Sequence, residues 1–215
     1  WVGAKLSDVV ADARFAFVVM SHVGEHFPDF IGRMCEISEI LHHDGLVSLV
    51  LPDRRLTFDR LRANATSREM IDAYAAQIAR PSLGQLYDSF SNHVDINAAE
   101  IWDTAVTNAA LDARRIHSPA TAYRLAVEAD QSDSYPDVHC WAFTSHSFLL
   151  VMRELVAAEL LPFAVEAFYP AEKGTNEFFV TLRRDEDPDA AAASYEAFIA
   201  DEALHWTAND DAWPA

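Results

Sequence analysis

Short apolar runs and helix-periodic segments alternate in the first quarter of the chain. Residues 15–20 (FAFVVM) are the kind of continuous apolar run that buried strands of parallel sheets show. From Asp29 onward, apolar residues recur at intervals of three and four, which predicts a helix that is capped by Asp29 and ends just before Gly45. Residues 46–52 (LVSLVLP) predict a second strand. Strand, helix and strand in this order predict a βαβ unit with parallel strands and a right-handed crossover.

The middle of the chain, from about residue 57 to residue 134, carries helix signals and no convincing strand. The amphipathic segments are residues 66–79, 82–94 and 97–115, and a further helix begins at Ser118-Pro119. We therefore predict a helical insertion over residues 57–134 that interrupts the elements of the sheet.

The strand pattern returns after the insertion. Residues 144–161 predict a helix with an inward apolar face formed by Phe148, Val151, Met152, Leu155 and Val156. Residues 163–170 and 177–184 predict two strands, and the turn residues between them predict an antiparallel hairpin. A final Ala-rich, acidic helix is expected from residue 188. The fold class expected for residues 1–215 is therefore one α/β domain.

The net charge argues against two classes of partner. The chain of 215 residues has a net charge of −18, which disfavours binding to nucleic-acid backbones or to anionic membranes. Half of this charge lies in residues 185–215, which contain nine acidic residues and no Lys or Arg, and which we interpret as a solvated helix and tail. No apolar run is long enough to span a membrane. Cys35 and Cys140 are far apart and match no metal-thiolate spacing, so we expect a reducing, cytoplasmic location.

One segment of about 45 residues resembles a known family. The stretch FAFVVMSHVGEHFPDF, followed by EISEILHHDGLVSLVLPD, is similar to the second half of class I S-adenosylmethionine (SAM) dependent methyltransferases, and most closely to the branch called type 11. That family shows a strand, then H-V-x-E-H and Pro-Asp, then a helix and the next strand. The resemblance extends from residue 15 to about residue 184. It implies a Rossmann-like methyltransferase sheet that ends in an antiparallel hairpin.

The glycine-rich loop and the ribose-binding acid of this family are absent from the sequence. In such folds the glycine loop lets the backbone approach the cofactor at a helix N-terminus. Both features would precede Trp1, and we expect them in sequence upstream of this residue. Without them the sheet would expose one face and one edge, which a partner or oligomer would have to cover.

The resemblance implies a cofactor site at the end of the first strand. Ligands of open parallel sheets bind beyond the carboxyl ends of the strands, where Met20, Ser21 and His22 are predicted to lie. These three residues are the candidates for lining the methionine part of SAM. Asp8, upstream of the strand, is the candidate for holding the adenine amine, although an acid in a solvated loop is the simpler interpretation.

Two histidines are candidate catalytic groups. His26 follows the first strand, and His139 follows the insertion; the ordinary pKa of histidine suits a general base if the acceptor must lose a proton. The alternative is that both are structural. His22 and His26 are spaced as in the zinc motif H-E-x-x-H, but Glu25 stands at the wrong position, and Gly24 opposes a long helix. We therefore predict no metal ligands here.

Arg54 and Arg55 follow the second strand and stand out in so acidic a chain. A guanidinium offers a fork of donors to an anionic or polyhydroxylated substrate, although pairing with carboxylates is an equal alternative. His93 lies in the insertion, which we expect to form a lid over the substrate. These three residues are the candidate substrate-binding groups.

Three functions remain open from the sequence. The resemblance implies a SAM-dependent methyltransferase that acts on a small-molecule or sugar acceptor. The first alternative is a non-catalytic methyltransferase-like subunit of a hetero-oligomer, and the second is a metal-dependent hydrolase that uses His22 and His26.

Overall fold

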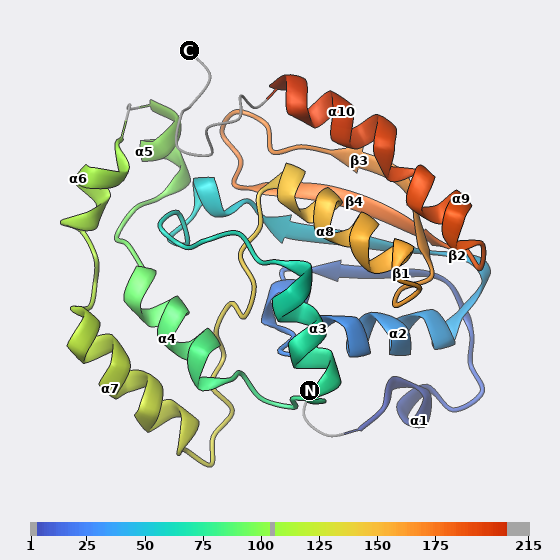
Figure 1. The fold of residues 1–215 in the computed structure, drawn as a ribbon, viewed down its shortest axis with the longest axis horizontal. Coiled ribbons are helices and arrows are strands. Elements are labelled where there is room, and N and C mark those ends of the chain that lie inside the picture. The colour runs from blue at the N-terminus through green and yellow to red at the C-terminus, as the bar shows by residue number, and fades with distance from the viewer. Residues whose placement is uncertain (1–3, 104–105, 206–215) are drawn as a thin grey trace.

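The protein contains a four-stranded mixed sheet. The computed structural model describes residues 4–103 and 106–205, in which the strand order is β1-β2-β4-β3. β1 (Phe15–Ser21) and β2 (Leu41–Pro52) run parallel, and β4 (Glu177–Arg184) runs antiparallel to both β2 and β3 (Phe163–Tyr169) (Figure 1). The predictions of an α/β fold, of parallel first strands and of a C-terminal hairpin are confirmed.

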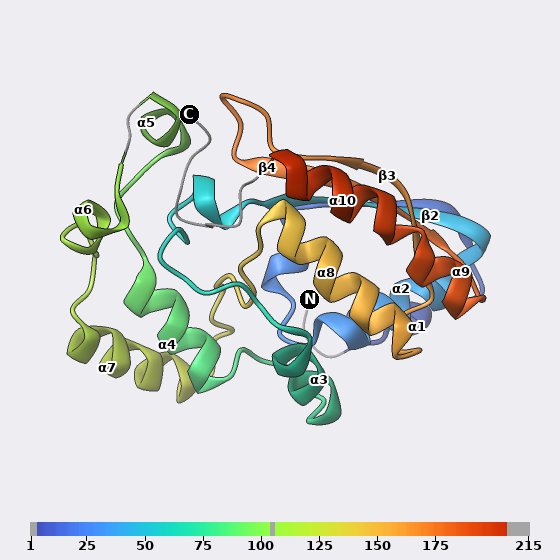
Figure 2. The same ribbon diagram turned by 45° about the horizontal axis from the view of Figure 1, so that its top comes forward.

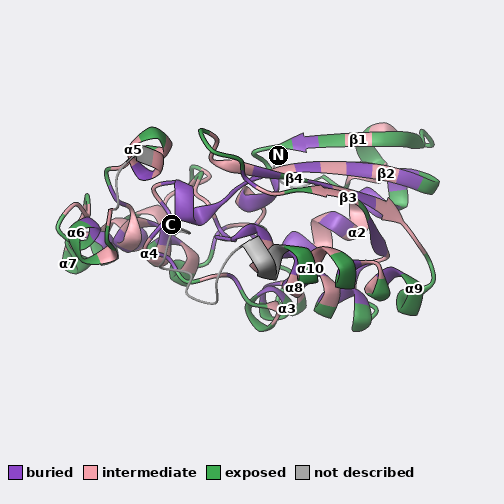
Figure 3. Ribbon diagram, turned by 90° about the horizontal axis from the view of Figure 1, so that it is seen from above, coloured by how far each residue is buried: buried purple, intermediate pink, exposed green. Residues whose placement is uncertain are grey.

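The helices of the sheet layer lie on one face of the sheet (Figure 3). They are α2 (Phe30–Ile40), α3 (Ser67–Ala75), α8 (Ser145–Ala157), α9 (Pro188–Ala193) and α10 (Tyr195–His205). Strand side chains alternate between the two faces. Val47, Leu49 and Leu51 of β2 are at most 1% exposed beneath the helices, as are Val180 and Leu182 of β4. This face holds the main hydrophobic core.

The opposite face of the sheet has no helix over it in the described residues (Figure 3). Phe17 and Val19 of β1 are 49% and 62% exposed, and Phe179 of β4 is 41% exposed. β1 is also an edge strand, since it pairs with β2 alone. The expected exposed face and edge are therefore present among the described residues.

The crossover helix begins as predicted but ends earlier. The Asp29 carboxylate accepts a hydrogen bond from the Gly32 N–H at 2.8 Å and caps α2. The helix ends at Ile40, where Leu41 adopts extended backbone and begins β2 at once. The prediction that Gly45 follows a longer helix is wrong, since Gly45 is a buried residue of β2. A Cβ at that position would lie 2.9 Å from the His42 carbonyl oxygen, so close packing explains this glycine.

The insertion is helical, as predicted, apart from isolated bridges such as Val94 with Arg115. After α3 come α4 (Leu83–Asn92), α5 (Ala98–Asp103), α6 (Asn108–Asp112) and α7 (Pro119–Asp130), which we call the helical lobe. The single helix predicted over residues 97–115 is wrong. Thr107 has extended backbone, and its hydroxyl accepts a hydrogen bond from the Ala110 N–H to start α6 separately. The lobe lies beyond the carboxyl ends of β1 and β2 (Figures 1 and 2).

The C-terminal elements complete the covered face. All five apolar residues predicted for the inner face of α8 are buried. The predicted final helix, residues 188–206, is divided at Ser194 into α9 and α10, and its last predicted residue, Trp206, lies outside the described part of the chain. The Ser194 hydroxyl accepts a hydrogen bond from the Val165 N–H at 2.8 Å, which ties this break to β3. A short helix, α1 (Leu6–Val10), precedes β1 and contacts α2.

Within the described residues, none of the helices combines the length and the apolar character that crossing a lipid bilayer requires.

Candidate functional site

The parallel strands end beside a cavity of about 310 Å³. Its lining comes from the ends of both strands, from the segment after β2, from the start of α5 and from the loop before α8; it includes His22, Pro52, Thr57, Phe58, Asn97 and His139. Two short 3-10 helices, η1 (Gly24–His26) and η2 (Arg54–Leu56), follow β1 and β2. The carboxyl ends of parallel strands are the usual ligand-binding edge of such a sheet.

The three residues predicted to line a cofactor, Met20, Ser21 and His22, have side chains in different surroundings. Met20 is only 8% exposed and contributes to the hydrophobic core under the helices, whereas Ser21 is exposed at the end of β1. His22 has a positive φ of 52°, which is uncommon for a residue with a Cβ and turns the chain sharply. The His22 ring borders the cavity and forms a 2.6 Å hydrogen bond between its Nε2 and Glu177 Oε2. Ser21 and His22 are thus better placed for ligand contact than Met20.

His26 and His139 come together although the insertion separates them in sequence. The N–H of Cys140 donates to the Glu25 carbonyl oxygen at 2.7 Å, and this bond holds the loop before α8 across η1. The Trp141 indole N–H adds a 2.6 Å hydrogen bond to the Phe27 carbonyl oxygen. The two histidine rings consequently meet edge to face, with centroids 4.8 Å apart. The structure thus brings both predicted catalytic histidines to one place.

Glu25 lies beneath these rings and is completely buried. Neither carboxylate oxygen accepts a hydrogen bond within the described residues. Two histidine nitrogens lie nearby, His22 Nδ1 at 3.5 Å and His26 Nε2 at 3.9 Å from Oε1. A buried carboxylate without hydrogen bonds is costly, so this arrangement requires an explanation.

A second buried carboxylate, Asp59, orients His139. Its Oδ2 lies 2.6 Å from His139 Nδ1, and its Oδ1 accepts a hydrogen bond from Arg62 at 3.1 Å. Burial raises the pKa of Asp59, but the hydrogen bond from His139 and the charge of Arg62 outweigh burial and leave this pKa below its ordinary value. Arg62 also donates to the carbonyl oxygens of His139 and Cys140. Asp59 therefore fixes the His139 ring, and Arg62 fixes both Asp59 and the backbone of the segment that carries this ring.

Arg54 and Arg55 occupy the interior, 7% and 4% exposed. Arg55 forms a forked pair with the fully buried Asp53, with Nε to Oδ1 at 2.8 Å and Nη2 to Oδ2 at 2.5 Å. Arg54 donates to Asn64 Oδ1 at 2.5 Å and to the Arg60 carbonyl oxygen at 3.0 Å. These contacts favour a structural role that fixes the segment after β2. Substrate binding by either arginine stays a prediction.

His93 stacks on Phe58, with ring centroids 4.5 Å apart and an interplanar angle of 8°. Burial lowers the pKa of His93, against an opposing influence from Asp59. Phe58 lines the cavity and also contacts the His139 ring, with centroids 4.9 Å apart. His93 thus does not line the cavity itself but packs against Phe58, which does.

Asp8 is not brought to this site. It is an exposed residue of α1, which precedes the start of β1, whereas Ser21 and His22 follow the end of that strand. Seven strand residues separate these two ends by roughly 20 Å at the usual rise per residue.

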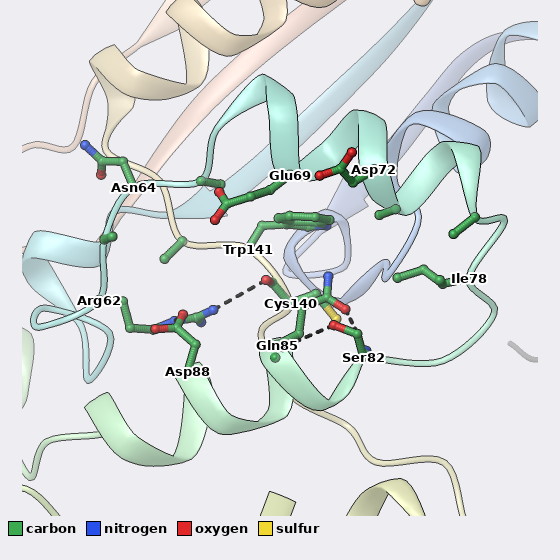
Figure 4. Close-up of a pocket in the computed structure, with 16 residues that line it drawn as sticks. Arg62, Asn64, Glu69, Asp72, Ile78, Ser82, Gln85, Asp88, Cys140 and Trp141 are labelled. Atoms are coloured by element: carbon green, nitrogen blue, oxygen red, sulfur yellow. Dashed lines mark hydrogen bonds and ion pairs between the residues drawn. The ribbon is translucent and has the colours of Figure 1, made fainter. Parts of the chain in front are cut away.

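A larger cavity of about 440 Å³ lies between α3 and α4 (Figure 4). Trp141 forms part of its wall, and the acids Glu69, Asp72 and Asp88 line it. Asp88 is paired with Arg62 at 2.7 Å. None of the residues predicted from the sequence to form a site lines this cavity.

Cys140 is predicted to be chemically inert in the folded protein. Its side chain is 3% exposed, and burial raises the pKa of its thiol to about 12, so little reactive thiolate forms. In a Cys35→Ser variant, Cys140 is the one remaining cysteine, and we expect its reaction with a chromogenic disulfide reagent at pH 8 to be at least about a hundredfold slower than in denaturant. A Cys140→Ser variant, which reports on the half-buried Cys35, is the control. Equal rates in native and unfolded protein would contradict the burial of Cys140.

The sequence analysis missed the carboxylates of the site. Glu25 was considered there only as a residue at the wrong position for the zinc motif, and Asp59, Asp137 and Glu177 were given no role. The charged run from Asp53 to Arg62 was the available signal, because it places two acids and four arginines within ten residues directly after an apolar strand. Burial of that run could not be read from residue type.

No protein-family model, no curated protein and no solved structure matches this chain.

Proposed function

We propose that this chain forms the second half of a SAM-dependent methyltransferase domain that acts on a small-molecule or sugar acceptor. The observation that carries the proposal is the strand arrangement: two parallel strands, followed by a hairpin whose last strand, β4, inserts in reverse between β2 and β3. The resemblance of residues 15–184 implies the parallel pair and the terminal antiparallel hairpin of this arrangement. A cavity at the carboxyl ends of the two parallel strands is the second observation that supports the proposal.

The residues at these strand ends fit one wall of a cofactor site. Ser21 is exposed there, and His22, which follows it, has a positive φ of 52°. The second wall would be a glycine-rich loop packed beside β1, and the exposed edge and face of β1 offer a place for such a unit. Bound SAM would supply an electrophilic methyl group, so the protein needs mainly to orient the acceptor and exclude water.

The lobe and the loop before α8 would supply the acceptor side of the site. Asn97 and Phe58 border the cavity together with His139, whose ring is fixed by Asp59. His139 would receive the proton of an acceptor hydroxyl if one must be lost. In this proposal Arg54 and Arg55 do not bind the substrate but stabilise the segment that forms the cavity wall.

Calorimetric titration of the full-length polypeptide with SAM tests the proposal. We expect saturable binding, and we expect Ser21→Val to weaken it at least about tenfold, which corresponds to about 1.4 kcal/mol. Thr181→Val is the matched control, because Thr181 is a strand residue in the middle of β4, away from the strand ends. Absence of binding at millimolar SAM, or equal affinities for both variants, would contradict the proposal.

The exposed face of the sheet favours one alternative, a methyltransferase-like subunit without its own activity. Phe17, Val19 and Phe179 on that face would then be covered by a different protein. Light scattering and intact mass of the native protein distinguish the two. If the chain is found solely in a hetero-oligomer and does not bind SAM, the result supports the alternative of a subunit without its own activity.

A further inference from the structure

Three histidines converge on the buried carboxylate of Glu25 in a common pattern. In each, one ring nitrogen lies close to a carboxylate of another segment. His22 Nε2 and His139 Nδ1 form 2.6 Å hydrogen bonds with Glu177 and Asp59. His26 Nδ1 lies 2.7 Å from Asp137 without hydrogen-bond geometry, so this third contact is an ion-pair distance alone. The other ring nitrogens of His22 and His26 face Glu25 Oε1 at 3.5 and 3.9 Å. In His139, Nδ1 faces Asp59, so Nε2 is the ring nitrogen available to a ligand.

This pattern is typical of metal centres. A histidine that binds a metal almost always donates its second ring N–H to a carboxylate or carbonyl, which fixes the ring and raises its basicity. One ligand atom each from Glu25, His26 and His139 lies within 4.8 Å of the others. Two donors about 2.1 Å from one ion lie roughly 3 to 4 Å apart, so rotations that move the side chains by about 1 Å would close the site.

The burial of Glu25 is an independent observation that points to a ligand. Its side chain is 1% exposed and both its oxygens lack hydrogen bonds within the described residues. A bound cation would satisfy this carboxylate, which otherwise carries an unbalanced desolvation cost.

We propose that Glu25, His26 and His139 form a binding site for a divalent first-row transition-metal ion, with His22 as the nearest additional donor. Two imidazoles and one carboxylate suit Zn²⁺ or Fe²⁺ better than Mg²⁺ or Ca²⁺, which prefer oxygen ligands. His139 and His22 also line the cavity at the strand ends. The open coordination positions of the ion would therefore face that cavity and accept an oxygen-bearing ligand.

This site differs from the zinc motif considered in the sequence, because His139 joins it from beyond the insertion. The three ligands belong to η1 and to the loop before α8, which the Cys140 N–H to Glu25 bond holds together. The proposal does not depend on SAM binding, but an ion bound to His139 Nε2 would replace the general-base role proposed above for this ring, because Asp59 occupies the other ring nitrogen. The metal site holds or fails whether or not the chain is a methyltransferase.

Titration of the full chain, purified without a histidine tag, with Zn²⁺ against a chromophoric chelator tests the proposal. We expect one tight site per chain and a higher unfolding temperature with Zn²⁺, because the ion binds the native state. Glu25→Gln and His139→Gln should each lower the affinity at least about tenfold. Loading with Co²⁺ gives a visible absorption spectrum that should be lost in the same variants.

His43→Gln is the matched control, since His43 is a histidine whose side chain is 74% exposed. It should leave both the Zn²⁺ affinity and the Co²⁺ spectrum unchanged. Circular dichroism establishes that each variant is folded. If Glu25→Gln or His139→Gln fails to fold, Asp137→Asn, whose side chain is 77% exposed, replaces it and should weaken Zn²⁺ binding several-fold. Absence of tight binding by the wild type, or affinity unaffected by Glu25→Gln, overturns the site.

Discussion

Replacing Asp53 by Asn is expected to destabilise the fold by about 3–5 kcal/mol, because the Arg55 guanidinium would stay buried without its carboxylate. Asp53 is fully buried and accepts both arms of Arg55, as well as the N–H of Ser145 at 3.2 Å. It therefore joins the end of β2 to the start of α8. Urea unfolding measures the loss as a lower midpoint with an unchanged slope.

The control for this change is Asp72→Asn. Asp72 pairs with Arg68 at 3.4 Å on α3, but the two side chains are 71% and 77% exposed. A solvated pair of this kind contributes less than about 1 kcal/mol. Equal effects of Asp53→Asn and Asp72→Asn would contradict the buried position of the Asp53–Arg55 pair.

Replacing Phe178 by Ala is expected to cost about 3–5 kcal/mol of unfolding free energy. Phe178 is fully buried on the helical face of β4, and its ring lies 5.5 Å from that of Phe148 and 6.0 Å from that of Phe168. Truncation would leave a cavity between the sheet and α8 that the surrounding rings cannot fill without moving.

The neighbouring residue provides the matched control. Phe179 has the same side chain but points to the opposite face, where it is 41% exposed. Phe179→Ala should cost less than about 1 kcal/mol in the isolated chain, since little apolar area is recovered by folding. If it proved as damaging as Phe178→Ala, the open face of the sheet would be covered by something outside the described residues.

The local elements of this protein were predictable because their signals are local. The apolar run at residues 15–20 became β1, and Asp29 caps α2 as expected. Helix starts were equally well marked: Thr66 and Ser82 each form a reciprocal capping box with the residue three positions later. The predicted end of α2 was wrong because a glycine can either end a helix or allow close packing. Gly45 was interpreted as a helix terminator, whereas its role is close packing inside β2.

The roles of charged residues were less predictable, because charge does not reveal burial. Arg54 and Arg55 have the composition of a substrate-binding pair, yet their guanidinium groups lie inside the fold against partners from their own chain. Asp59 and Glu25 carried no signal as single residues in the sequence. Their surroundings depend on a loop that returns after the whole insertion.

The sequence by itself determined the order and type of the main elements, since periodicity and capping act over a few residues. It also predicted the edge of the sheet at which a ligand would approach, since the carboxyl ends of parallel strands meet there. Only the tertiary structure decided which side chains meet there. His26 and His139 became neighbours because the Cys140 N–H bonds to the Glu25 carbonyl oxygen across η1, a contact between residues far apart in the chain. Such long-range contacts leave no periodic trace in a sequence.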